Sequence, residues 1–210
     1  MIIVILIGDS GVGKTSILSK YIKGIFPVAP APTIAIEFAT KIIQIKEGGY
    51  IKAQIWDSAG QERYKAIVAG HYRRAAGALI VYDVTKKSTF EHVVNWLNNV
   101  NEMAEKNCLT YLIGNKIDLL EQNENNREVS IEDAKNFAKK NGLRFYETSA
   151  LTSVKINDCF EDLLQEIYNE RRKIKGILND SVYKNNNKIL YLNKPTEDSE
   201  SSFGNFENCC

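Results

Sequence analysis

The stretch "GDSGVGKT", residues 8–15, decides the fold, because it has the spacing G-x-x-x-x-G-K-[ST] of a phosphate-binding loop. It follows the apolar run "IIVILI" and precedes the helix-like "SILSKYIK", which is the strand, loop and helix context that the motif requires. Glycines permit turns that a side chain would block, so consecutive N–H groups point at an anion at the start of a helix. The stretch therefore predicts a phosphate site without identifying its ligand.

Two side chains of this loop carry chemistry that suits a nucleotide. We expect Lys14 to add a positive charge beside the β- and γ-phosphates, and Thr15 to offer its hydroxyl to Mg²⁺, which bridges the same oxygens. The predicted ligand of the loop is thus a magnesium-bound phosphate chain. The expected contacts come from Ser10, Gly11, Val12, Gly13, Lys14, Thr15 and Ser16.

Apolar, β-branched runs alternate with helical patterns along the chain. The runs predict strands over residues 2–7, 38–46, 50–56, 78–83, 109–114 and 144–147. The helical patterns cover residues 16–23, 88–104, 131–141 and 154–175. This alternation predicts an α/β fold with a mostly parallel six-stranded sheet and helices on both faces. Gly48 and Gly49 indicate a tight turn between the second and third strands, so we expect one antiparallel strand at the edge.

Two segments of the chain are polar and lack this alternation. Residues 121–130 are typical of a surface loop, with Ser130 as the N-cap of the following helix and Asp133 at the capping-box position. Beyond residue 175 the sequence is polar and has no sustained periodicity, which predicts a flexible tail. We therefore expect one folded domain over residues 1–175 and a tail over residues 176–210.

Composition excludes several classes of protein. A formal net charge of +1 over 210 residues gives no reason to expect nucleic acid as a partner. The apolar start, residues 1–7, is too short to span a bilayer and lacks the basic region and cleavage site of a signal peptide. A reducing interior compartment is the simplest assumption, because neither zinc-ligand spacing nor a disulfide framework is formed by Cys108, Cys159, Cys209 and Cys210.

The stretch "WDSAGQE", residues 56–62, adds candidates for hydrolysis. Asp57 ends a predicted strand, where its carboxylate can hold a magnesium-bound water opposite Thr15. Gly60 lets its N–H approach a γ-phosphate, and Gln61 can orient an attacking water, since phosphoryl transfer needs positioning more than covalent chemistry. Gln61 is therefore the predicted catalytic residue.

The stretch "GNKID", residues 114–118, indicates which base is bound. A carboxylate at Asp118 can accept hydrogen bonds from the N1–H and the exocyclic amine of guanine, whereas adenine presents neither donor in that arrangement. Asn115 can tie this stretch to the phosphate loop, and the stem of Lys116 can lie over the ring. The sequence therefore predicts GTP and GDP as ligands.

A second stretch, "ETSAL" at residues 147–151, follows the last predicted strand and completes the predicted base site. We expect its Ala150 N–H to meet the guanine O6, with Ser149 and Leu151 on either side as further contacts. All of these motifs fall at the carboxyl ends of strands, where ligands of such sheets bind.

With these motifs in place, the chain resembles the Ras-like small GTPases, and within them the Rab family, from residue 2 to about residue 173. The blocks that carry the resemblance are "TIAIEF", "KAQIWDSAGQERY", "HYRRAAGALIVYD" and "ETSAL". The stretches "IEFATKIIQI", "KAQIWD" and "KNGLRFYETSAL" are most similar to the recycling-endosome branch, Rab eleven. The resemblance implies a P-loop GTPase domain and a GTP-hydrolysing switch that regulates vesicle-mediated membrane traffic, in the recycling-endosome or post-Golgi pathway.

The resemblance also assigns roles in the switch regions. It implies that Thr33 joins Mg²⁺ and the γ-phosphate, and that Phe26 stacks edge-on against guanine. Switch I then runs over residues 26–37 and switch II over residues 58–72. It further implies that an exchange factor, a GTPase-activating protein and effectors bind at these regions, and that partners recognise an aromatic triad of Phe38, Trp56 and the residue at position 71. Departures from the family pattern occur at Ala35, Ser58, His71 and Arg74, and His71 replaces an aromatic member of that triad.

The chain ends in "NCC", where the resemblance implies that Cys209 and Cys210 each receive a geranylgeranyl group. Residues 176–210 contain three lysines against five acidic residues, so the tail cannot rely on anionic headgroups for membrane attachment. Two chains give a stable anchor, which a GDP-dissociation inhibitor or escort protein must extract. We therefore expect the cytoplasmic face of endosomal, Golgi-derived or vesicle membranes, with a cytosolic pool.

Two other functions fit part of the sequence. A nucleotide-dependent, membrane-anchored binding module without turnover would share the loop and the base site, but Gln61 favours hydrolysis. A P-loop kinase or ATPase would share the loop alone, and Asp118 argues against adenine.

Overall fold

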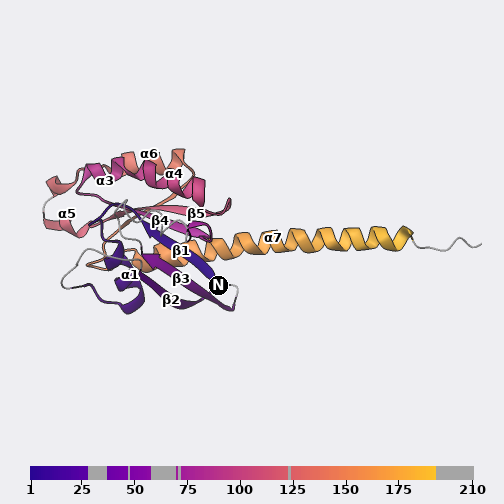
Figure 1. Ribbon diagram of the computed structural model, residues 1–210. Helices are drawn as coiled ribbons and strands as arrows, with labels where there is room; N and C mark the ends of the chain where they lie inside the picture. The colour runs from indigo at the N-terminus through magenta and orange to yellow at the C-terminus, as the bar shows by residue number, and fades with distance from the viewer. Residues whose placement is uncertain (28–36, 47, 58–69, 71, 123, 193–210) are drawn as a thin grey trace, which may run out of the picture. The chain divides into compact units, whose positions relative to one another are not determined.

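The computed structural model describes residues 1–27, 37–46, 48–57, 70, 72–122 and 124–192, and within these ranges it describes side chains as far as residue 174, except at residues 122 and 124. Its centre is a six-stranded sheet with the strand order β2-β3-β1-β4-β5-β6 (Figure 1). The strands are β1 (Ile2–Ile7), β2 (Glu37–Gln44), β3 (Tyr50–Asp57), β4 (Gly77–Asp83), β5 (Leu109–Asn115) and β6 (Arg144–Thr148). The predicted α/β architecture is confirmed.

Five of the strands run parallel, and β2 pairs antiparallel with β3 at one edge. The turn that joins these two strands contains Gly48 and Gly49, whose φ angles of 83° and 104° lie in the left-handed region that favours glycine. The backbone N–H of Gly48 donates to the carbonyl oxygen of Ile45 at 3.1 Å. The predicted glycine turn and the antiparallel edge strand are therefore confirmed.

The helices are α1 (Lys14–Lys23), α3 (Lys87–Glu91), α4 (Val93–Met103), α5 (Asp118–Gln122), the short 3₁₀ helix η2 (Glu124–Asn126), α6 (Ile131–Lys140) and α7 (Ile156–Leu192). Ser130 caps α6 as predicted, because its Oγ accepts from the N–H of Asp133 at 3.0 Å and donates to that carboxylate at 2.7 Å. Such a cap satisfies one of the N–H groups that have no partner inside the helix.

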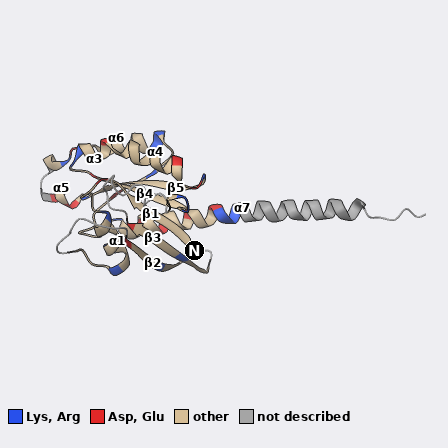
Figure 2. Ribbon diagram, in the orientation of Figure 1, with Lys and Arg blue, Asp and Glu red and all other residues tan. Residues whose placement is uncertain are grey.

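Helices cover both faces of the sheet. Successive side chains of a strand point to opposite faces, so a strand can pack apolar side chains against helices on both sides. In β1, Val4 and Leu6 pack with residues of α1 and α7, whereas Ile5 and Ile7 pack with residues of α4 and α6. In Figure 1 the two helix layers lie on opposite sides of the strands. Every residue of β4 is buried, and the strands carry few charged residues in Figure 2. The sheet therefore offers its ends, rather than its faces, to a ligand.

The structure differs from the predicted elements in three places. The helix predicted over residues 88–104 is divided at His92, where Asn95 N–H bonds to the His92 carbonyl oxygen at 3.0 Å in a tighter turn. The loop predicted over residues 121–130 contains the end of α5 and η2, which are too short for periodicity to reveal.

The third difference concerns the last helix, which was predicted to end at residue 175 but continues as α7 to Leu192. The prediction that regular structure ends at residue 175 is therefore wrong for residues 176–192. Helical backbone satisfies its own hydrogen bonds without a packing partner, and the first proline after residue 175 is Pro195. The chain forms two compact units, Met1–Asn169 and Glu170–Cys210, and the boundary between them lies within α7.

Candidate nucleotide site

The phosphate loop joins β1 to α1, and two of its glycines are required by close backbone approaches. Gly8 has a φ of 137°, and a Cβ atom there would lie 2.1 Å from the carbonyl oxygen of Val81 in β4. Gly13 has a φ of 100°, and a Cβ atom there would lie 2.4 Å from the amide nitrogen of Asn115. Side chains at either position would push the loop away from the strand ends. The steric reason for these glycines is therefore confirmed.

Lys14 lies at the first turn of α1 with only 5% of its surface exposed. Its ammonium donates to the carbonyl oxygens of Gly8 at 2.8 Å and Asp9 at 2.7 Å, so the loop wraps around the lysine. Burial lowers the pKa of Lys14 from 10.5 to about 8, although the nearby carboxylates of Asp57 and Asp9 raise it. A buried cation in the first turn of a helix is suited to binding an anion, as a phosphate chain requires.

The candidate magnesium ligands are brought together across the sheet. The hydroxyl of Thr15 donates to Asp57 Oδ2 at 2.5 Å, although the two residues are 42 positions apart. Asp57 is fully buried, and this burial raises the pKa of its carboxyl from 3.8 to about 6. Its second oxygen, Oδ1, has no hydrogen-bond partner among the described residues. A buried carboxylate oxygen without a partner, next to a hydroxyl, fits a hard divalent cation with oxygen ligands.

The candidate base site is organised by Asn115 at the end of β5. Its side-chain nitrogen donates to the carbonyl oxygen of Val12 in the phosphate loop at 2.9 Å. Its side-chain oxygen accepts from the Thr148 hydroxyl at 3.2 Å and from the Ala150 N–H at 3.3 Å. One buried amide thus holds the phosphate loop and the "ETSAL" stretch together, which confirms the predicted tie to the phosphate loop. Because the Ala150 N–H is directed to Asn115, its contact with guanine O6 stays a prediction.

Asp118 and Lys116 follow Asn115 in the same stretch, and each is held by a residue of another part of the chain. The Ser149 hydroxyl donates to Asp118 Oδ1 at 2.6 Å, and the same hydroxyl accepts from the Thr152 N–H at 3.0 Å. This support fixes the carboxylate that is predicted to read guanine. Lys116 has a left-handed φ of 73°, and its ammonium lies 2.7 Å from Asp83 Oδ2 at the end of β4. This ion pair holds the ammonium at the end of β4, and the position of the Lys116 stem over the ring stays a prediction.

The remaining predicted residues fall into two groups. Ser10, Gly11, Phe26 and Leu151 are exposed, and Ser16 is buried in the first turn of α1. Residues that lie outside the described part of the chain are Thr33, Gly60, Gln61, Cys209 and Cys210. The same holds for the departures Ala35, Ser58 and His71, whereas Arg74 is exposed. Roles assigned to these residues stay predictions.

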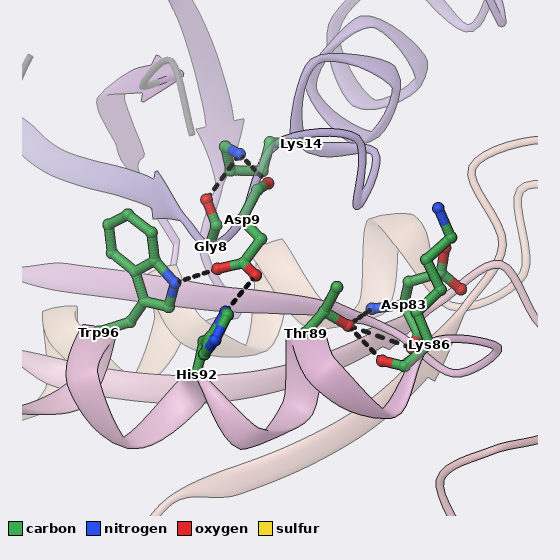
Figure 3. A network of polar contacts seen from close by, with 8 residues as sticks. All are labelled: Gly8, Asp9, Lys14, Asp83, Lys86, Thr89, His92 and Trp96. Atoms are coloured by element: carbon green, nitrogen blue, oxygen red, sulfur yellow. Dashed lines mark hydrogen bonds and ion pairs between the residues drawn. The ribbon is translucent and has the colours of Figure 1, made fainter. Parts of the chain in front are cut away.

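Sequence reasoning missed two further sets of polar contacts, one at the phosphate loop and one between the end of β4 and α3 (Figure 3). Asp9 accepts a hydrogen bond from the Trp96 indole N–H at 2.8 Å, and its other oxygen lies 2.7 Å from His92 Nδ1. In addition, the Thr89 hydroxyl accepts from the Asp83 N–H at 3.0 Å and donates to the Lys86 carbonyl oxygen at 2.7 Å. These partners are far apart in the chain or belong to no motif, so no sequence pattern indicates them.

Comparison with known proteins decides the family. The family model described as Ras family matches residues 3–169. The chain is 48% identical over 184 residues to Ras-related protein RABA2a of Arabidopsis thaliana, which covers 88% of this chain and 82% of the relative. It is 48% identical over 166 residues to Ras-related protein Rab11A of Lotus japonicus, covering 79% and 71% of the two chains. The chain is a Rab protein of the Ras family.

As a Rab protein, it is a small GTPase that binds guanine nucleotide and hydrolyses GTP to GDP and phosphate. Ras-related protein Rab11C of Nicotiana tabacum is a further relative, 46% identical over 184 residues, or 88% of this chain and 80% of the relative. These names agree with the resemblance to the Rab eleven branch. The family assignment favours this GTPase activity over a kinase or ATPase and over a binding module without turnover. In the part of the Rab chain that the structure describes, no helix is both long and apolar enough to cross a membrane.

Proposed function

We propose that this Rab protein is a GTP-regulated switch of vesicle-mediated membrane traffic, acting in the recycling-endosome or post-Golgi pathway. Support for the pathway comes from the identity of 46–48% to relatives that carry RABA and Rab11 names. Support for the switch comes from a site in which phosphate loop, metal ligands and base loop meet at one end of the sheet. We assign residues 1–175 to the GTPase domain and residues 176–210 to a tail.

The single observation that carries the nucleotide assignment is the buried Asn115 amide, which bonds both the phosphate loop and the base loop. Lys14 and the N–H groups of the loop hold the phosphates, whereas Asp118 accepts from the guanine edge. Because Asn115 joins these two parts, the distance between phosphate and base recognition is fixed by the protein. In this proposal Gln61 orients the attacking water. The protein therefore accelerates hydrolysis by positioning the water and not by forming a covalent intermediate.

Mg²⁺ is the proposed cofactor, with Thr15, Asp57 and Thr33 as its protein ligands. When bound, the ion neutralises charge on the β- and γ-phosphates. Asp57 contributes a buried carboxylate with an unpartnered oxygen, and the Thr15 hydroxyl lies next to it. Burial favours the protonated form of Asp57, so a cation must offset the cost of its negative charge.

Removal of the metal tests this assignment. We expect release of a fluorescent GDP to accelerate by at least tenfold when EDTA replaces Mg²⁺, because an interaction of about 1.4 kcal/mol or more is lost. In the Asp57→Asn variant the acceleration by EDTA should be small, since the site is already impaired. Equal release with Mg²⁺ and with EDTA in the parent would show that no metal is held here.

Regulatory partners follow from the switch assignment. We propose that an exchange factor, a GTPase-activating protein and effectors bind the switch regions at residues 26–37 and 58–72. The aromatic rings of Phe38 and Trp56 have their centroids 4.8 Å apart, and Phe38 is 56% exposed. The exposed Phe38 ring, packed on the partly buried Trp56, supports the proposed effector surface. The third member of the aromatic triad, at position 71, is a histidine in this chain. We therefore expect its choice of partners to differ from that of relatives with tyrosine there.

We propose that Cys209 and Cys210 carry two geranylgeranyl groups and hold the protein at the cytoplasmic face of endosomal, Golgi-derived or vesicle membranes. A GDP-dissociation inhibitor or escort protein would maintain a cytosolic pool. The net charge of −2 over residues 176–210 supports lipid rather than electrostatic attachment. Cell fractionation of the Cys209→Ser/Cys210→Ser variant tests this proposal: we expect it in the soluble fraction with GTP binding unchanged. If it stays with membranes like the parent, the anchor lies elsewhere.

A further inference from the structure

Both oxygens of the Asp9 carboxylate are held by the segment where α3 meets α4 (Figure 3). Trp96 Nε1 donates to Asp9 Oδ1 at 2.8 Å, and His92 Nδ1 lies 2.7 Å from Asp9 Oδ2. The sequence separation is 87 residues for the first contact and 83 for the second. We call these three side chains the Asp9 clamp. The clamp connects the second residue of the phosphate loop to a helix junction outside that loop.

The clamp acts on the residue that also holds the phosphate-binding lysine. Asp9 accepts from the Lys14 ammonium with its backbone carbonyl oxygen at 2.7 Å, while its side chain is held by the helix junction. A shift of Asp9 therefore moves an oxygen that positions Lys14. His92 is the capping residue shared by α3 and α4, so its backbone is fixed by the ends of both helices. The clamp thus limits the freedom of the loop.

One member of the clamp is an imidazole, whose protonation changes the hydrogen bond to Asp9. The hydrogen bond and the charge of Asp9 raise the pKa of His92 above its ordinary value of 6.5, and the neighbouring Glu91 adds to this. The Asp9 carboxylate also interacts with Lys14 of the phosphate loop, whose pKa it raises. Among the described residues, the charges around His92 are therefore Asp9 from the loop, Glu91 from α3 and, beyond Asp9, Lys14. The first two favour the imidazolium.

We propose that His92 and Trp96 are positioning residues for the phosphate loop, and that protonation of His92 slows the release of bound guanine nucleotide. This rests on guanine nucleotide binding at the loop. Below the raised pKa of His92, the clamp contains a charge-assisted hydrogen bond between two ions. As pH rises through that pKa, the bond becomes a weaker one from neutral imidazole, so the loop opens more readily. Nucleotide is therefore retained better at low pH.

The expected effect is moderate because the His92 side chain is 55% exposed and that of Asp9 is 21% exposed. Partly exposed ion pairs change equilibria by about two- to fivefold. We therefore expect release of fluorescent GDP from the parent to be about two- to fivefold slower at pH about 6 than at pH about 8.5. The Trp96 contact does not titrate, so it contributes equally at both pH values.

The release rate in variants separates titration of His92 from other effects of pH. In His92→Asn we expect the parent's fast rate at both pH values, because the variant cannot form the ionic bond. Trp96→Phe keeps an aromatic ring but loses the indole donor, so release should accelerate by a similar factor at both pH values. Val94→Asn is the matched control, since it places the same residue on an exposed position of the same helix and should follow the parent.

A second measurement does not depend on nucleotide release. The pKa of His92, followed by NMR of its imidazole in the GDP-bound full chain, should fall toward the ordinary value in Asp9→Asn. The proposal is overturned if His92→Asn keeps the pH dependence of the parent, or if Asp9→Asn leaves the pKa of His92 unchanged. By contrast, a protein that retains no guanine nucleotide at any pH would overturn the nucleotide site itself.

Discussion

Replacement of Asn115 by alanine tests the link between the phosphate loop and the base loop. The variant removes a donor to the Val12 carbonyl oxygen at 2.9 Å and an acceptor for two groups, at 3.2 Å from Thr148 and 3.3 Å from Ala150. These partners are 0%, 0% and 3% exposed, so water cannot readily replace the amide. Each buried group without a partner costs about 1–3 kcal/mol, with the two longer bonds at the low end. We expect a loss of about 3–5 kcal/mol in the free energy of unfolding.

The assay is urea unfolding of the full chain at a fixed excess of GDP, because ligand concentration itself shifts the apparent stability. Release of fluorescent GDP gives a second readout, and it should accelerate by at least about tenfold, since both loops lose their common anchor. Asn126→Ala is the matched control: the Asn126 amide donates to the Leu119 carbonyl oxygen at 3.1 Å, but the residue is exposed. Its expected cost is about 0.5 kcal/mol. If Asn115→Ala costs no more than this control, the amide does not join the two loops.

Three further predictions address chemistry and charge. Gln61→Leu should lower the single-turnover rate of intrinsic hydrolysis while nucleotide affinity is kept; an undiminished rate refutes the catalytic role. Asp118→Asn should shift preference from GTP toward XTP, because the new amide can donate to the 2-oxo group of xanthine; continued preference for GTP in a competition assay counts against this residue as the guanine reader. The pKa of Lys14 is lowered from 10.5 to about 8, so the native state binds fewer protons than the unfolded state between these values. Stability of the nucleotide-free protein should therefore rise with pH in this window, and Lys14→Met should remove that rise; an unchanged slope in Lys14→Met means that another group is responsible.

The sheet and its site were predictable because their signals are local. The apolar run before Gly8 and the G-x-x-x-x-G-K-T spacing place a strand, a loop and a helix in order, and each later motif follows a strand of its own. Since parallel strands end at the same edge, Asp57, Asn115 and Ala150 were expected to meet there. The structure confirms that Asp57 lies at Thr15 and that Asn115 reaches both loops.

What the sequence did not indicate depends on contacts between distant residues or on very short elements. His92 and Trp96 lie more than 80 positions from Asp9, and neither belongs to a motif. The spacing of apolar residues is not interrupted where α3 and α4 divide at His92, so residues 88–104 have the sequence pattern of one helix. Beyond residue 175 the polar composition favoured a flexible tail, because propensity and periodicity are weak guides where a helix has few packing partners.

The central claim is that one site recognises guanine and hydrolyses the γ-phosphate of its nucleotide. Its most direct test is single-turnover phosphate release from the purified full chain with Mg²⁺, using GTP and ATP in parallel, alone and with a Rab-type GTPase-activating protein. We predict slow release from GTP, acceleration by the activating protein of about 10³-fold or more, and no release from ATP above the rate without protein. Release from ATP at a rate equal to that from GTP, or no release from GTP even with the activating protein, would contradict the account.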